Sequence, residues 1–159
     1  MTSSSSDRRK IGVAVLGATG VVGQKFIQLL DGHPVFVLVA VTTGRRESQG
    51  RLYGDVTVWR LGGSIPACAA GLRMIATDPA TCAEAGAVVA FSALPTDVAR
   101  SAEPLFARAG FAVCSNSSPY RMAADVPLLI PEVNPASVRP MVAVQRRRWQ
   151  QQRPLLGQS

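Results

Sequence analysis

The sequence predicts an α/β fold built on a doubly wound parallel sheet. Continuous apolar strands, an amphipathic helix between the first two of them, and a glycine-rich turn after the first strand support this. The chain has 159 residues, 47% hydrophobic and 17% charged, which is typical of a globular protein and not of a disordered one. Its longest apolar run, residues 35–41, is seven residues long. A membrane span needs about 20 residues, so we expect none.

The first elements form a strand–helix–strand unit. Residues 11–16 have the composition of a buried strand, which Gly17–Gly20 end. A helix follows and ends at His33-Pro34, because the residue before a proline disfavours helical geometry. Residues 35–41 are continuously apolar, as in a parallel strand covered on both faces. Helical spacing gives the expected buried stripe: Val22, Phe26, Leu29 and Leu30.

Strands alternate with helices in the rest of the chain. After a loop at 42–66, we expect strands at 73–76, 87–91 and 111–114, with a last helix at 137–149. Such alternation predicts right-handed crossovers and a parallel sheet. A helix capped by Thr96 is expected to bury one face: Val98, Ala102, Leu105, Phe106 and Ala109.

The charge lies mainly at the two ends of the chain. The formal net charge is +7, but residues 11–140 contain ten basic and nine acidic residues. A nearly neutral body disfavours nucleic acid as a partner, and the basic ends remain as an alternative contact surface. We expect disordered segments at 1–10 and 150–159, with one domain at 11–149 between them.

Three glycines follow the first strand at a spacing typical of a dinucleotide-binding turn. Gly17 would permit the tight turn, Gly20 would let the backbone approach a pyrophosphate, and Gly23 would allow close helix packing. The free amides of Thr19 to Val22 would face the anion at the positive end of the helix. An ordinary glycine-rich turn is the alternative.

The end of the second strand favours NADP over NAD. NAD-binding folds usually carry an acidic residue there to hold the ribose 2′-hydroxyl. This chain instead has Thr42-Thr43-Gly44 followed by Arg45 and Arg46, and arginine pairs with a 2′-phosphate. The alternative is that the two arginines are solvated and that Glu47 is the acid, displaced along the chain.

Several segments together resemble the aspartate-semialdehyde dehydrogenase family, most closely its fungal and archaeal branch. The resemblance implies a Rossmann-like NADP-binding domain with an incomplete second domain. It also implies reduction of aspartyl phosphate to aspartate semialdehyde, on the route to lysine, methionine and threonine. Malonyl-coenzyme A reductases are similar and stay open as an alternative. The resemblance lies in these segments: Gly17–Phe26, His33-Pro34, Tyr53-Gly54-Asp55, Trp59, Phe91–Leu94, Ser115-Asn116, Tyr120-Arg121-Met122 and Val126–Pro135.

The resemblance also assigns roles to individual residues. Glu132 and Asn134 would border the active site, although Asn116 and Asn134 have the alternative role of satisfying a turn. The cofactor would be bound at the pyrophosphate by Gly17, Thr19, Gly20, Val21 and Val22, at the 2′-phosphate by Arg45 and Ser48, along its length by Ser92, Ala93 and Leu94, and near the nicotinamide by Asn116.

The family's nucleophile, a cysteine in an Asn-Cys-Ser/Thr context, has no counterpart in this sequence. Cys68, Cys82 and Cys114 match no metal or redox spacing, and we expect reduced, mostly buried thiols. Cys114 lacks the base that a nucleophile needs, and His33 is expected to be structural. No catalytic or metal site is therefore assigned.

We expect an oxidoreductase portion that ends before the catalytic cysteine and is inactive alone, located in the cytoplasm, with homo-oligomerisation left open. Apolar residues 126–133 are expected to be exposed. A non-catalytic nucleotide-binding or interaction module and a related acyl-phosphate reductase fragment remain as alternatives. A short-chain type of oxidoreductase is disfavoured because no Tyr-x-x-x-Lys pair is present.

Overall fold

The computed structural model describes residues 10–130, 132–134 and 136. The expected helix at 137–149, the expected segment at 150–159 and all of the expected segment at 1–10 except Lys10 lie outside these residues. The chain divides into two compact units, Met1–Ser117 and Ser118–Ser159, and each is described by itself.

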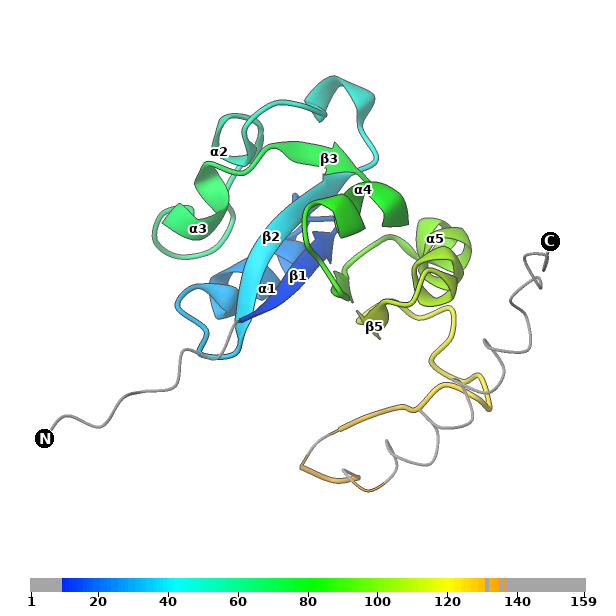
Figure 1. The fold of residues 1–159 in the computed structure, drawn as a ribbon. Coiled ribbons are helices and arrows are strands. Elements are labelled where there is room, and N and C mark those ends of the chain that lie inside the picture. The colour runs from blue at the N-terminus through cyan, green and yellow to red at the C-terminus, as the bar shows by residue number, and fades with distance from the viewer. Residues whose placement is uncertain (1–9, 131, 135, 137–159) are drawn as a thin grey trace, which may run out of the picture. The chain divides into compact units, whose positions relative to one another are not determined.

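Five parallel strands form the sheet of the first unit, in the order β3-β2-β1-β4-β5 (Figure 1). The chain runs outward from the central β1 to β3 and then crosses to the other side of β1, so the winding reverses between β1 and β4. This arrangement confirms the doubly wound α/β prediction. The strands are β1 Ile11–Leu16, β2 Phe36–Thr43, β3 Met74–Ala76, β4 Val89–Ser92 and β5 Ala112–Ser115.

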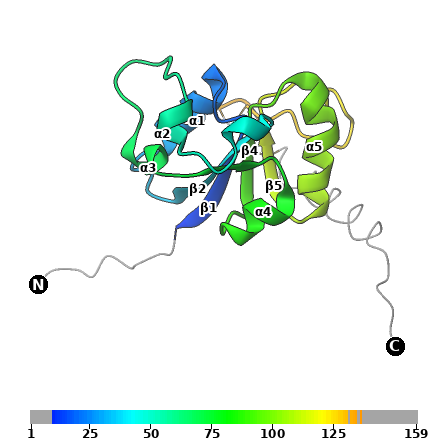
Figure 2. The same cartoon turned by 90° about the horizontal axis from the view of Figure 1, so that it is seen from above.

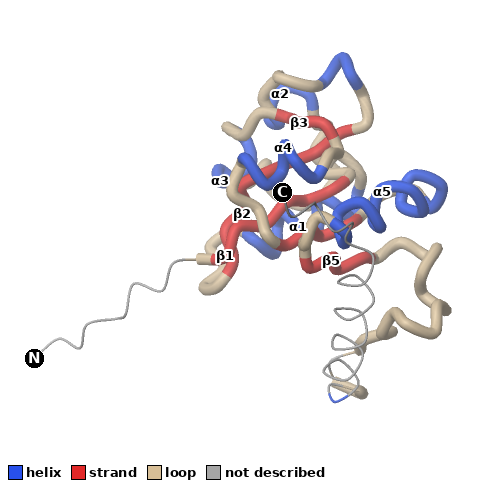
Figure 3. The backbone as a smooth tube through the Cα atoms, turned by 45° about the vertical axis from the view of Figure 1, so that its right-hand side comes forward, coloured by secondary structure: helices blue, strands red, loops and turns tan. Residues whose placement is uncertain are grey.

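Helices cover both faces of this sheet. The helix α1 packs on β1 and β2, whereas α5 packs on β4 and β5. In Figure 2, α1, α2 and α3 lie together, away from α4 and α5, and Figure 3 shows the strands side by side with the helices outside them. The helices are α1 Val21–Leu30, α2 Tyr53–Val56, α3 Ala67–Ala70, α4 Pro79–Glu84 and α5 Thr96–Arg108, with a 3-10 turn η1 Arg46–Ser48.

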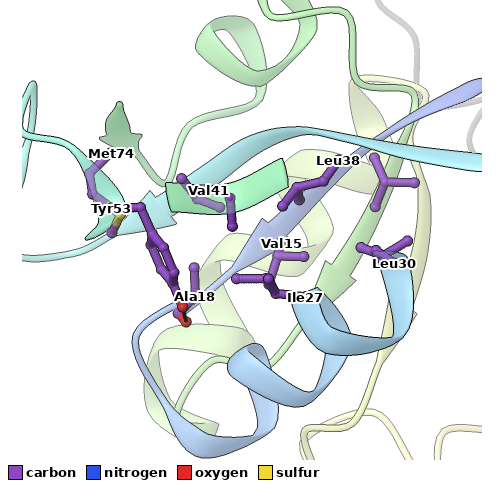
Figure 4. Packing of buried hydrophobic residues seen from close by; sticks show 10 residues of the cluster. Val15, Ala18, Ile27, Leu30, Leu38, Val41, Tyr53 and Met74 are labelled. Atoms are coloured by element: carbon purple, nitrogen blue, oxygen red, sulfur yellow. Dashed lines mark hydrogen bonds between the residues drawn. The ribbon is translucent and has the colours of Figure 1, made fainter. Parts of the chain in front are cut away.

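The core has two halves, one on each face of the sheet. Val13 and Val15 of β1 belong to the half under α1, and Ala14 and Leu16 belong to the half under α5. Figure 4 shows the first half, where Ile27 and Leu30 from α1 meet the strands. Burial on both faces explains why β1 and β2 are continuously apolar.

The buried face of α1 differs from the expected stripe. Gly23, Gln24, Ile27 and Leu30 are buried, whereas Val22 is 40% and Leu29 is 60% exposed. Of the expected stripe, Leu30 is buried and Phe26 is half-buried, its ring stacked on Phe91 at 5.2 Å. The rotation follows from Gly23, which has no side chain and lets the helix rest on the preceding turn.

The helix α5 also differs in its cap and its buried face. Pro95, not Thr96, is the N-cap. Ala99, Glu103 and Phe106 are buried, and of the expected stripe Val98 and Leu105 are 40% and 51% exposed. Two contacts explain the rotation. The Ser115 hydroxyl donates to Glu103 Oε1 at 2.6 Å, and Phe106 packs edge-on against Phe111 at 5.1 Å.

The described part of the second unit consists mainly of turns and of chain without regular secondary structure. The Asn134 side chain donates to the Leu128 carbonyl and accepts from the Ile130 amide, both at 2.7 Å, so Asn134 does satisfy a turn. The expected apolar exposure is confirmed at four residues: Leu128, Leu129, Ile130 and Val133. None of the helices in the described residues has the length and apolarity that a membrane span requires.

Candidate functional site

The residues expected to bind a cofactor follow the carboxyl ends of four strands. Because all five strands are parallel, these ends lie along one edge of the sheet. The glycine turn follows β1, Arg45 and Ser48 follow β2, Ser92 ends β4 and Asn116 follows β5. This edge, at the point where the winding reverses, is where open α/β sheets bind ligands.

Backbone contacts bring three of these groups together. The Ala93 amide donates to the Leu16 carbonyl at 2.9 Å, and the Asn116 amide donates to the Ser92 carbonyl at 3.0 Å. The glycine turn, residues 92–94 and Asn116 are therefore neighbours. Ser48 donates its amide to the Arg45 carbonyl at 3.1 Å. No hydrogen bond within the described residues joins Arg45 or Ser48 to the glycine turn.

The three glycines are needed for different reasons. Gly17 has a φ of +74°, a backbone conformation that residues with a side chain rarely adopt. A Cβ there would also lie 2.8 Å from the Ala93 carbonyl oxygen. The backbone conformation and the lack of space therefore each require a glycine at 17. A Cβ on Gly23 would lie 2.9 Å from Ala18 Cα. Gly20 is exposed, and a Cβ there would meet only the Gly17 carbonyl oxygen, at 3.5 Å. The internal packing therefore does not require a glycine at 20.

The turn and the start of α1 offer backbone donors to that open side. The amides of Thr19, Val21, Val22 and Gly23 have no hydrogen-bond partner among the described residues. The sequence also predicts a free amide at Gly20, but in the structure this amide donates to the Gly17 carbonyl at 3.2 Å. The first turn of α1 has neither a side-chain cap nor an acidic residue. These unpaired donors at a helix start fit an anionic phosphate group.

Two buried polar side chains that sequence reasoning missed hold this turn. The Tyr53 hydroxyl donates to the Ala18 carbonyl at 2.8 Å, which Figure 4 shows. Gln24 donates to the carbonyls of Thr19 at 3.0 Å and Val58 at 2.9 Å. Both side chains are fully buried. Gln24 lies on the helix face that the apolar stripe did not include, and Tyr53 lies in a segment predicted to be loop.

The protonation of Tyr53 gives a testable pH dependence. Burial raises the pKa of Tyr53 from its ordinary 10 to about 12, so the folded chain keeps the phenol proton that the unfolded chain loses above pH 10. This stability is fully present below pH 10 and is lost as the pH rises to about 12, with a limiting slope of about 1.4 kcal/mol per pH unit. Urea unfolding at several pH values measures it. Tyr53→Phe should lack this slope, and equal slopes in both proteins would contradict the assignment.

The side chains at the β4 and β5 ends are less accessible than expected. Ser92 is fully buried, and its hydroxyl has no partner among the described residues. Leu94 is also buried, Ala93 is half-buried and Asn116 is exposed. Of these four residues, Ala93 and Asn116 have side chains that a ligand could reach.

The cysteines and the histidine form no reactive centre in the described part of the chain. Cys82 is buried and Cys68 is half-buried, while Cys114 on the edge strand β5 is exposed, so the prediction of burial is wrong for Cys114. Burial raises the pKa of Cys68 and Cys82 to about 11, which keeps both thiols neutral. His33 Nδ1 accepts from the Val35 and Phe36 amides, a structural role. Among the described residues, no cluster suits a metal ion.

Comparisons with known proteins show the family to which this fold belongs. A family model described as "Semialdehyde dehydrogenase, NAD binding domain" matches residues 12–140. An aspartate-semialdehyde dehydrogenase from Archaeoglobus fulgidus is 51% identical over 123 residues, which cover 77% of this chain and 35% of that protein. A malonyl CoA reductase (NADP) from Metallosphaera sedula is 38% identical over 141 residues, which cover 89% of this chain and 38% of that protein.

A solved structure has the same fold over most of this chain. It is that of aspartate semialdehyde dehydrogenase with NADP from Candida albicans, with a TM-score of 0.76 and 38% identity. The match covers 82% of this chain and 36% of that chain, so this chain spans little more than a third of the length of these relatives. Since the family model covers most of its residues, the chain belongs to the semialdehyde dehydrogenase NAD-binding domain family, and its cofactor is a nucleotide.

Proposed function

We propose that this chain is the NADP-binding portion of an oxidoreductase similar to aspartate-semialdehyde dehydrogenase. The observation that supports this most directly is the set of unpaired amides at Thr19, Val21 and Val22, beside the open face of Gly20. They lie where the sheet winding reverses, and they would donate to the pyrophosphate oxygens. Gly17 supports the same turn through its positive φ.

The residues after β2 support NADP as the nucleotide. The strand ends at Thr43, whose hydroxyl accepts from the Arg45 amide at 3.1 Å, so no carboxylate stands at the strand end. Arg45 and Arg46 are exposed, and neither forms a salt bridge with the described residues. A guanidinium without a carboxylate partner is available to pair with a 2′-phosphate. We therefore assign Arg45 and Ser48 to the 2′-phosphate.

The other end of the edge would hold the rest of the cofactor. The cofactor would be lined there by Ser92, Ala93 and Leu94. Ser92 and Leu94 are buried and would contact the cofactor through their backbone. Asn116 would lie toward the nicotinamide. The bound nucleotide supplies a hydride. The role of the described residues is to bind and orient it, because the turn amides fix the pyrophosphate and residues 92–94 limit how far the cofactor can shift.

The substrate class is proposed from the relatives. The identity is 51% to the archaeal aspartate-semialdehyde dehydrogenase and 38% to the malonyl CoA reductase. We therefore propose that the complete protein reduces aspartyl phosphate to aspartate semialdehyde. Assays of a full-length protein with aspartyl phosphate and with malonyl-coenzyme A would decide between the two substrates.

A titration of the chain with NADPH and NADH tests the cofactor assignment. We expect NADPH to bind and NADH to bind more weakly. Replacing both Arg45 and Arg46 by alanine should weaken NADPH binding roughly tenfold and leave NADH binding unchanged, because only NADPH carries the 2′-phosphate. Cofactor fluorescence measures both dissociation constants.

The control for this test is Lys25→Ala, which removes one positive charge where the arginine variant removes two. Lys25 is an exposed cation on α1 whose side chain bonds to Gln28 at 2.9 Å, so its loss changes the net charge without touching the edge. NADPH affinity should be retained in that variant. An equal loss of NADPH and NADH binding in the arginine variant would contradict the 2′-phosphate assignment, and a wild-type chain that binds neither nucleotide would contradict the proposed function.

A further inference from the structure

We propose that Tyr53 and Gln24 are positioning residues that hold the glycine turn in the orientation that receives a pyrophosphate. This inference rests on the proposed function and adds to it. Neither side chain faces the open side of the edge, since both are fully buried. They act on the peptide groups of the turn, from the side opposite to the ligand.

Tyr53 fixes the direction of the Thr19 amide. Ala18 C=O and Thr19 N–H belong to one peptide group, and in a trans peptide these two bonds point in opposite directions. The hydroxyl of Tyr53 binds the Ala18 oxygen from the core, at 2.8 Å. The Thr19 N–H must therefore point away from the core, and it is one of the amides without a partner in the described residues.

Gln24 fixes the next peptide group. Its Nε2 donates to the Thr19 carbonyl at 3.0 Å and to the Val58 carbonyl at 2.9 Å, while its Oε1 accepts from the Arg60 amide at 2.7 Å. Two carbonyl partners and one N–H partner define the orientation of the side-chain amide. Gln24 thus links the turn to residues 58–60 through a satisfied buried network, the kind that is stiff and costly to break.

The peptide group before these two is held as well. The Ala18 amide donates to the Thr42 carbonyl of β2 at 3.2 Å. Three consecutive peptide groups of the turn are thus anchored by β2, by Tyr53 and by Gln24. A turn held in this way has its donors aligned before a ligand arrives, which reduces the ordering cost of binding.

The test compares two probes on the full chain carrying Tyr53→Phe. NADPH contains the pyrophosphate, whereas adenosine 2′-monophosphate contains the 2′-phosphate and lacks the pyrophosphate. Loss of the Ala18 anchor should weaken NADPH binding about tenfold and leave binding of adenosine 2′-monophosphate unchanged. Cofactor fluorescence measures the first and an NMR titration the second.

Leu38→Val is the matched control. Leu38 belongs to the same core half as Tyr53 but pairs with Val13, well before the end of β1. This variant should lose stability and keep both affinities. The inference is overturned if Tyr53→Phe weakens the binding of NADPH and of adenosine 2′-monophosphate equally, or if it weakens the binding of neither. If the wild-type chain fails to bind NADPH, the proposed function is what fails.

A second measurement needs no substitution and covers the case in which Tyr53→Phe does not fold. Amide hydrogen exchange in the wild-type chain, with and without NADPH, compares Thr19 with Gly20. Thr19 should be protected by the ligand because its N–H points outward. Gly20 should change little because its amide already donates to the Gly17 carbonyl. Equal protection of both, or no protection of Thr19, overturns the inference.

Discussion

Gly23→Ala is expected to lower both the stability of the fold and its affinity for NADPH. The added Cβ would lie 2.9 Å from Ala18 Cα and would also press on the Gly17 carbonyl oxygen. Both neighbours are backbone, so they yield only if the turn or α1 moves. Alanine gains about 1 kcal/mol of helix propensity, but overpacking typically costs about 1–3 kcal/mol. We expect a net loss of stability and more than about tenfold weaker NADPH binding, because the donors at Val21 and Val22 move with the helix.

Gly71→Ala provides the control for that substitution. Gly71 has a φ of −85°, and a Cβ added there would have no neighbouring atom within 4 Å. Alanine at this position should be neutral, or stabilising by roughly 0.4–1 kcal/mol. Urea unfolding and NADPH titration measure both variants. Wild-type NADPH affinity in Gly23→Ala would show that close packing at Gly23 is not what shapes the turn.

Phe106→Ala is expected to cause the largest loss of stability in the first unit. Phe106 is fully buried, and its ring packs on Phe111 at 5.1 Å, between α5 and β5. Deleting a buried phenylalanine typically costs about 3–5 kcal/mol, since the cavity is only partly refilled. The free energy of unfolding in urea measures this cost. Asn116 follows β5, so the edge of the candidate site should loosen as well.

Leu105→Ala is the control for Phe106→Ala, because it removes an apolar side chain from the neighbouring residue of the same helix. Leu105 is exposed, so its replacement should change the free energy of unfolding by less than about 0.5 kcal/mol. The apolar stripe expected from the sequence contains both residues, whereas the structure separates them. Comparable losses of unfolding free energy in Phe106→Ala and Leu105→Ala would contradict the structure, because they would indicate that both side chains are buried, as the apolar spacing predicts.

The order of the strands and the glycine turn were predictable because both depend on local signals, whereas the short helices α2, α3 and α4 were not predicted. Continuous apolar runs identify β1 and β2, and the spacing of Gly17, Gly20 and Gly23 identifies the turn between β1 and α1. Parallel strands then place the ends of β1, β2, β4 and β5 on one edge without further information. The placement of the candidate residues along that edge follows directly.

The rotation of the helices was not predictable from apolar spacing alone. The helix α1 carries apolar residues on two faces, and the contact of Gly23 with the turn selects the face with Ile27 over the face with Val22 and Leu29. In α5, Glu103 is buried because Ser115, twelve residues later, supplies a hydrogen bond. Such selection depends on partners that are brought near only by the fold.

The anchors of the glycine turn have a consequence for how the protein is made. The turn follows residue 16, but its anchors come from β2, from Tyr53 and from the segment that ends at Arg60. A chain leaving the ribosome therefore exposes the glycine segment well before the residues that shape it have been synthesised. Contacts over such separations form late because loop closure must come first. The glycine turn thus cannot reach its final shape until about forty further residues have emerged from the exit tunnel.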